Sequence, residues 1–247
     1  MELALDTSSQ EISIALSDKG TVISSYTWPT SHNETVELLP RITHLLEQNK
    51  VTMEKLDAVY VAHGPGSFNS LRVGLSIAKG LAYSLKIPII GLSTLEILAY
   101  PFALTKLPIY PILRVSNDRI ATAQYKNVES WQCLQQEHLT TVELLCLQIT
   151  EPVVFCGEIN EEICEVLKKN LGSKAILPKL PNIGHPKSIT RLGWERLSNG
   201  KHDNVFTLQP HYLREPHITK SKKRLPFAVP GQLPVKEEAS ESNGSQS

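Results

Sequence analysis

The sequence predicts an α/β protein built from two halves that share one order of elements: three strands, then helix, strand, helix, strand and helix. Two observations predict this fold class. Each half opens with three β-rich runs before any helical periodicity appears. In each half, short apolar runs then alternate with stretches in which apolar residues recur at helical spacing. The two halves have little sequence in common, so the repeat is one of pattern.

The first half is expected to contain five strands and three helices. The strands are expected at residues 2–5, 12–16, 22–28, 58–62 and 87–92. The helices are expected between residues 31 and 46, at 69–85 and from residue 93. Ile12, Ile14 and Leu16 alternate with polar residues, which is typical of a half-buried strand. Ser31 and Glu34 have the spacing of a capping box at the start of the first helix.

The second half is expected to repeat this order. Its strands are expected at residues 109–115, 120–125, 131–138, 153–156 and 175–177, and its helices at 142–149, 161–170 and 188–197. Two such halves side by side form the actin-like ATPase (ASKHA) fold, in which each half is RNase H-like (βββαβαβα). The sequence does not tell which half the last helix covers.

Three regions are predicted along the chain: a first domain at 1–105, a second, more divergent domain at 106–216, and a tail at 217–247. The tail combines a basic cluster with prolines and then Glu, Ser, Asn and Gly. Such a composition buries too little apolar surface to offset the entropy of ordering, so the tail is expected to be disordered. The basic cluster at 220–224 is interpreted as a solvated tail in preference to a contact with an RNA backbone.

The composition is that of an ordinary soluble globular protein. Lys plus Arg and Asp plus Glu both number 25, so net charge provides no general attraction to nucleic acid. No basic segment precedes an apolar run at the N-terminus, and no apolar run approaches the roughly 20 residues of a membrane span. The four cysteines lack C-x-x-C spacing, which favours reduced thiols. A cytoplasmic protein with no membrane contact is therefore expected.

Two turns are candidates for phosphate binding. One follows the first strand, and the other is the glycine-bearing turn before the helix at 69–85. The candidate residues are Asp6, Thr7, Ser8, Gly64, Gly66 and Ser67. In actin-like ATPases the first of these turns cradles phosphates. The alternative is that both are tight turns whose side chains bond their own backbone. The second half lacks a glycine-rich turn that could face these two across a nucleotide, so no cofactor is firmly expected. Binding of ATP or ADP at an interface shared with a partner stays open.

Catalytic motifs are absent from the sequence. No two of the eight histidines are four residues apart, and neither H-E-x-x-H nor G-x-S-x-G occurs. We therefore expect no metal site and no catalytic residue. Two alternatives stay open: a small-molecule kinase or ATPase of the same fold, and a peptidase that would use Ser67 or His63.

The helix at 69–85 is apolar nearly all round, although a helix on a sheet needs only one apolar face. Gly74, Ala78 and Ala82 recur every four residues and would let another helix approach closely. The residues predicted to bind a partner subunit are Leu38, Leu39, Ile42, Leu45, Leu71, Gly74, Leu75, Ala78 and Ala82. Pairing of two such patches would produce a homodimer. The alternative is that these helices only bury each other within one domain. On the partner-binding interpretation, Ala78→Arg is expected to break association without unfolding the chain.

Several segments together resemble the TsaB family. They are Asp6-Thr7-Ser8-Ser9, Gly64-Pro65-Gly66-Ser67-Phe68, Leu71-Arg72-Val73-Gly74-Leu75, Ala78-Lys79-Gly80-Leu81-Ala82, residues 87–96, and Tyr212-Leu213-Arg214. The resemblance covers nearly all of the first hundred residues, and the second half is divergent up to the last segment. Family members usually carry Thr-Gly where this chain has Asn69-Ser70.

The resemblance implies a function. It implies a non-catalytic scaffold or activator subunit of the complex that forms N6-threonylcarbamoyladenosine at position 37 of tRNAs reading ANN codons. The implied partners are a TsaD-type catalytic subunit, whose H-x-x-x-H metal motif this chain lacks, and a TsaE-type ATPase. Contact with tRNA would be indirect, through the complex.

Overall fold

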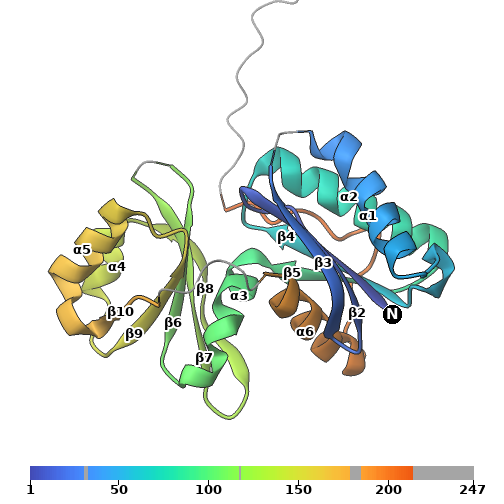
Figure 1. Cartoon of the computed structure of the whole chain (residues 1–247). Helices are drawn as coiled ribbons and strands as arrows, with labels where there is room; N and C mark the ends of the chain where they lie inside the picture. The colour runs from blue at the N-terminus through green and yellow to red at the C-terminus, as the bar shows by residue number, and fades with distance from the viewer. Residues whose placement is uncertain (31–32, 117, 179–184, 214–247) are drawn as a thin grey trace, which may run out of the picture. The chain divides into compact units, whose positions relative to one another are not determined.

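The structure is a computed structural model that describes residues 1–30, 33–116, 118–178 and 185–213. It contains two five-stranded mixed sheets, each with helices against it (Figure 1). The expected tail at 217–247 lies outside the described residues, and the domain limits proposed from the sequence stay a prediction. Within the described ranges, no helix is long and apolar enough to cross a membrane.

The first sheet has the strand order β3-β2-β1-β4-β5. Its strands are β1 (Glu2–Asp6), β2 (Glu11–Asp18), β3 (Thr21–Pro29), β4 (Ala58–Gly64) and β5 (Ile89–Ser93). The helices of this part of the chain are α1 (Glu34–Gln48), α2 (Phe68–Leu85) and α3 (Thr94–Ala99), with short 3-10 turns at Met53–Lys55 and Tyr100–Thr105. β2 runs antiparallel to β1 and β3, whereas β4 and β5 run parallel to β1. The residues of one face of this sheet pack against α1 and α2.

The second sheet repeats this topology with the order β8-β7-β6-β9-β10. Its strands are β6 (Ile109–Arg114), β7 (Ile120–Asn127), β8 (Trp131–Thr140), β9 (Val153–Gly157) and β10 (Ala175–Ile176). The helices that follow are α4 (Val142–Leu147), α5 (Glu161–Leu171) and α6 (His185–Ser198), with a 3-10 turn at Gly172–Lys174. The repeated order and strand directions confirm the predicted α/β fold of two RNase H-like halves in the actin-like arrangement.

The two halves exchange their last helices. α6 packs on the face of the first sheet opposite α1 and α2, where Ile189 and Leu192 share a buried cluster with Ala4 and Tyr60. α3 packs on the second sheet, on the face opposite α4 and α5, while its Ile97 also joins the buried cluster of the first sheet. The question that the sequence left open is therefore answered: the last helix covers the first half.

The start of α1 differs from the predicted capping box. The helix begins at Glu34 with Asn33 as its N-cap, and Ser31 lies outside the described residues. Glu34 is therefore the first residue of the helix and not the third. Its buried carboxylate accepts hydrogen bonds from the hydroxyls of Thr30 and of Ser70 on α2, the latter at 3.2 Å, so it joins the starts of two helices.

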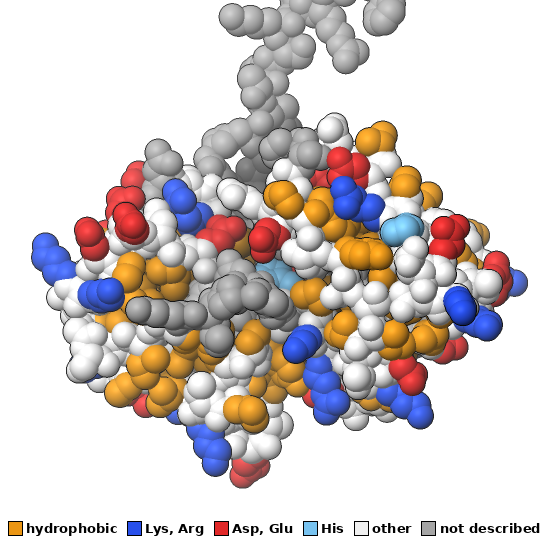
Figure 2. All heavy atoms as spheres, viewed as in Figure 1, with side chains coloured by type: hydrophobic (Ala, Val, Ile, Leu, Met, Phe, Trp, Pro, Cys, Tyr) orange, Lys and Arg blue, Asp and Glu red, His pale blue; other side chains and the backbone are white. Residues whose placement is uncertain are grey.

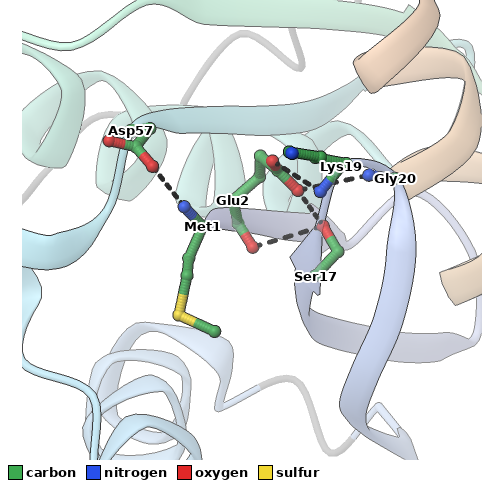
Figure 3. Close-up of polar contacts among 6 residues, drawn as sticks. All are labelled: Met1, Glu2, Ser17, Lys19, Gly20 and Asp57. Atoms are coloured by element: carbon green, nitrogen blue, oxygen red, sulfur yellow. Dashed lines mark hydrogen bonds and ion pairs between the residues drawn. The ribbon is translucent and has the colours of Figure 1, made fainter.

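The β2–β3 hairpin is held by Glu2, whose side chain is buried although it is charged. Its carboxylate accepts hydrogen bonds from Ser17 Oγ at 2.7 Å and from the backbone nitrogens of Lys19 and Gly20 at 3.0 and 3.4 Å (Figure 3). Gly20 has a φ of +74°, and a Cβ there would lie 2.7 Å from Cβ of Trp194 on α6. The hairpin tip therefore needs glycine, and it supports α6 where that helix crosses the sheet.

Candidate functional site

The turns that follow β1 and β4 pack directly against each other. Ser67 N donates to Ser8 O at 2.9 Å, and a Cβ at Gly66 would lie 2.2 Å from the same oxygen. Thr7 Oγ1 donates to the carbonyl of Ser70 at 2.7 Å. Only glycine fits at position 66, because backbone touches backbone there. Both turns are therefore part of the packing between β1 and the start of α2.

Asp6, at the end of β1, has both carboxylate oxygens occupied. Oδ1 accepts from the backbone N and the hydroxyl of Ser8 at 3.0 and 2.6 Å, and Oδ2 lies 2.9 Å from Nδ1 of His185. Burial alone would raise the pKa of Asp6, but the hydrogen bond and charge of His185 and the bonds from Ser8 hold it below its usual value. Asp6 is thus a buried, ionised carboxylate with both oxygens engaged by neighbours within the chain.

His185 is the first residue of α6 and is only 9% exposed. Burial lowers the pKa of this imidazole. The hydrogen bond and charge of Asp6, followed by the charges of Glu11 and Glu158, outweigh burial and raise the pKa above its usual value. The Asp6–His185 pair therefore links the start of the crossing helix α6 to β1 as an ion pair.

A cleft of about 970 Å³ lies at the carboxyl ends of β1, β4, β6 and β9, the usual place for a ligand in a sheet of this kind. Its lining residues are Ser8, Ser9, Gln10, Glu11, Thr30, Gly66, Ser67, Leu98, Leu113, Arg114, Val115, Ser116, Gly157, Glu158, Ile159, Asn160 and His185. Of the residues predicted to bind phosphate, Ser8, Gly66 and Ser67 line this cleft, whereas Asp6, Thr7 and Gly64 do not.

The charges in this cleft do not favour a polyphosphate. Glu11 and Glu158 offset Arg114 and the imidazolium of His185, and the Glu158 carboxylate accepts a hydrogen bond of 2.8 Å from the backbone N of Arg114. No group of three or more His, Cys, Asp or Glu residues in the described ranges is placed to hold a metal ion. The described part of the cleft thus supplies neither excess positive charge nor a clustered cation site.

The peptidase alternative would need Ser67 or His63 to act with a base, and within the described residues no hydrogen bond joins either of them to one. Ser67 Oγ lies 3.0 Å from Ser70 Oγ. His63 is half-buried; partial burial, followed by the charge of His211, lowers its pKa to about 4, and its Nδ1 has no hydrogen-bond partner among the residues described. The contact with Ser70 does not activate the Ser67 hydroxyl, because a second hydroxyl is not a general base.

Most of the residues predicted to bind a partner lie inside the chain's own core. Those that are buried are Leu38, Ile42, Leu45, Leu71, Gly74, Leu75, Ala78 and Ala82, and Leu39 is 45% exposed. A Cβ at Gly74 would lie 2.3 Å from Oγ1 of Thr7. The stripe of small residues therefore lets α2 approach the turn after β1. An arginine at position 78 would enter the core, so Ala78→Arg cannot test association without unfolding, contrary to expectation.

The opposite face of α2 carries a second stripe of small residues, Ser76, Gly80 and Ser84, and all three are exposed. A Cβ at Gly80 would meet no described atom within 4 Å. Val73, Ile77 and Leu81 are half-buried beside this stripe, and Val36 and Leu39 on α1 are 70% and 45% exposed. Figure 2 shows apolar side chains at the surface on the α1 and α2 side of the first sheet. We call this surface, from Val36 and Leu39 to Ser76, Gly80 and Ser84, the outer face.

The segment after α6, residues 203–213, was not recognised as an element from the sequence. It runs alongside α2 and the end of β4 (Figure 1). His211 N donates to the carbonyl of His63 at 2.7 Å, and Arg72 Nε donates to the hydroxyl of Tyr212 at 3.1 Å. The only sequence signal was Tyr212-Leu213-Arg214 in the family resemblance. We call residues 203–213 the C-terminal segment.

Comparison with known proteins identifies the family. A family model described as "TsaD: tRNA N6-adenosine threonylcarbamoyltransferase" matches residues 28–218. The tRNA threonylcarbamoyladenosine biosynthesis protein TsaB of Bacillus subtilis (strain 168) is 31% identical over 217 residues, which cover 86% of this chain and 93% of that protein. The chain belongs to the TsaB family.

Other relatives match shorter stretches. TsaB of Escherichia coli (strain K12) is 37% identical over 98 residues, 39% of this chain and 42% of that protein. The tRNA N6-adenosine threonylcarbamoyltransferase of Symbiobacterium thermophilum is 49% identical over 59 residues, 24% of this chain and 17% of that enzyme. Among solved structures, YeaZ from Pseudomonas aeruginosa has the same fold, with a TM-score of 0.71, 22% identity and coverage of 86% of this chain and 99% of YeaZ. The expected membership in the TsaB family is therefore confirmed.

Proposed function

We propose that this chain is a non-catalytic subunit in the biosynthesis of threonylcarbamoyladenosine on tRNA, and that it pairs through the outer face with a TsaD-type catalytic subunit. A TsaE-type ATPase is the third partner, and tRNA contacts the complex as a whole. Without its partner, the chain pairs with a second copy through the same face. Membership in the TsaB family supports the pathway. The observation that supports a non-catalytic role is that both carboxylate oxygens of Asp6 are already engaged by Ser8 and His185.

The engagement of both Asp6 oxygens argues against the alternative, a small-molecule kinase or ATPase of the same fold. In such an enzyme the acidic residue after the first strand positions a metal with the nucleotide phosphates. Here both oxygens of Asp6 are taken by Ser8 and His185, and Glu11 and Glu158 bring further negative charge to the cleft. A nucleotide would have to displace a buried ion pair before it met a metal.

The outer face has the properties of a helix-docking surface. The small side chains of Ser76, Gly80 and Ser84 leave a shallow groove along α2, and helices whose facing residues are small approach closely. Val36 and Leu39, on the neighbouring helix α1, add exposed apolar area to the outer face.

Gly80→Arg is expected to abolish association with the TsaD-type protein of the same organism. The new side chain fills the groove, and we expect affinity to fall by roughly 100-fold or more, as for an interface whose centre is obstructed. The fold should survive, because nothing crowds position 80 and arginine favours a helix by roughly 1 kcal/mol relative to glycine. Light scattering coupled to size exclusion, with titration of the labelled partner, measures the effect.

Asn170→Arg is the matched control, because it places the same side chain on the exposed face of α5 in the other half. It should bind the partner like the wild type. A folded Gly80→Arg variant that also binds normally would remove the outer face from the proposal.

The isolated chain is expected not to bind Mg-ATP in isothermal titration. Saturable binding by the wild type that disappears in an Asp6→Asn variant shown to be folded, together with no binding of the TsaD-type protein, would instead establish the kinase or ATPase alternative.

A further inference from the structure

Two aromatic side chains stand at the edge of the outer face. Tyr83 on α2 and Phe206 in the C-terminal segment are 62% and 71% exposed, and their rings meet edge to face with centroids 5.5 Å apart. Tyr83 follows Gly80 by three residues and therefore lies one turn further along α2, beside the groove. The aromatic pair and the outer face are thus continuous.

The C-terminal segment holds Phe206 in place through its backbone. Lys79 Nζ donates to the carbonyls of Phe206 and Leu208 at 3.4 and 3.0 Å, and Phe206 N donates to Oδ1 of Asn204 at 2.8 Å. Asp203 pairs with the edge of β5: its carboxylate accepts from Gly91 N at 2.7 Å. An exposed phenylalanine is thus fixed by polar contacts and not by burial of its own ring.

We propose that the C-terminal segment forms a second wall of the outer face, and that Tyr83 and Phe206 are its anchor for the TsaD-type partner. This inference rests on the proposed function. Exposed apolar side chains that form a contiguous patch mark interaction surfaces, and tyrosine is among the residues that contribute most to binding energy. Because Lys79 and Asn204 fix the segment beforehand, little conformational entropy is lost when a partner covers the pair. The complementary surface is an apolar pocket in the partner, beside the helix that fills the groove.

Phe206→Ala and Tyr83→Ala are expected each to weaken binding of the TsaD-type protein by roughly tenfold or more, mainly through faster dissociation. Lys79→Met removes the ammonium donors but keeps the aliphatic stem, and it should weaken binding less than Phe206→Ala because it loosens the segment and leaves the ring. Leu147→Ala, at an 81% exposed leucine of α4, is the control and should bind like the wild type. Biolayer interferometry with the full-length chains measures the rates, and thermal unfolding checks each variant.

The outcomes separate this inference from the proposed function. If the wild type does not bind the TsaD-type protein at all, the proposed function fails. Suppose that the wild type binds, that Gly80→Arg does not, and that both alanine variants bind normally. The outer face would then be supported as the binding surface, and the proposal that the C-terminal segment forms part of it would be wrong. Weaker self-association of Phe206→Ala with unchanged binding to the TsaD-type protein would also overturn the inference, because the pair would then serve a second copy of this chain.

Discussion

Gly193→Ala is expected to destabilise the chain, although alanine is the better helix former. A Cβ at position 193, in the middle of α6, would lie 2.4 Å from Cγ and Cδ2 of Tyr60. Tyr60 is fully buried on β4, so its ring cannot move away without disturbing the cluster of Ala4, Ile189 and Leu192. Overpacking of this kind costs about 1–3 kcal/mol, and alanine adds roughly 1 kcal/mol to a helix, so the expected net loss of stability is up to about 2 kcal/mol.

Gly80→Ala is the matched control for this prediction, since it makes the same change in the interior of α2 with no described atom within 4 Å of the new Cβ. It should raise the free energy of unfolding by up to about 1 kcal/mol. Urea denaturation followed by circular dichroism measures both variants. Equal shifts would mean that α6 has room to retreat from the sheet, and that the close approach at Tyr60 is not a constraint.

Asp6→Ala is expected to have the other large effect, a loss of about 3–5 kcal/mol near pH 6, because it leaves the buried imidazole of His185 without its partner. The pH dependence follows from the two shifts. The folded-state pKa of His185 lies above 6.5, so its contribution is complete below pH 6.5 and is lost as pH rises through the folded-state value. The folded-state pKa of Asp6 lies below 3.8, so its contribution is present above pH 3.8 and is lost as pH falls through the folded-state pKa.

The stability difference between wild type and Asp6→Ala should therefore be largest between about pH 4 and 6.5 and should shrink at alkaline pH. Urea denaturation at pH 6 and pH 9 tests this. A double-mutant cycle with His185→Gln isolates the energy of the pair from the loss of the Ser8 bonds. A difference that stays constant from pH 6 to pH 9 would show that His185 is not charged in the folded chain.

The fold could be predicted from the sequence because its strands and helices carry their own periodicities. The alternation of Ile12, Ile14 and Leu16 and the apolar positions of α2 identify elements without reference to the rest of the chain. The crossing of α6 could not be predicted in this way, because the pattern of a helix shows which of its faces is buried but not which sheet buries it. Gly193 marks the contact, yet its partner Tyr60 is more than a hundred residues away.

The candidate site was predictable only in part for a similar reason. Two stripes of small residues on α2 have the same four-residue spacing, and the sequence alone does not show that Gly74, Ala78 and Ala82 face inward while Gly80 faces outward. That choice depends on Thr7, which contacts Gly74 across the turn. The partnership of Asp6 with His185 joins residues 179 positions apart, a separation at which no local pattern operates.

The exchange of α3 and α6 makes each half dependent on the other for a complete interior. A fragment that ended at residue 105 would keep α1 and α2 but lose α6, and Ala4, Tyr60 and Leu92 on the other face of its sheet would meet water. The second half on its own would likewise lose the cover that Leu95 and Leu98 provide. The two halves repeat one topology, but neither is expected to be stable without the other. The chain is therefore expected to fold and unfold as one cooperative unit. Neither half could be transplanted alone as a module.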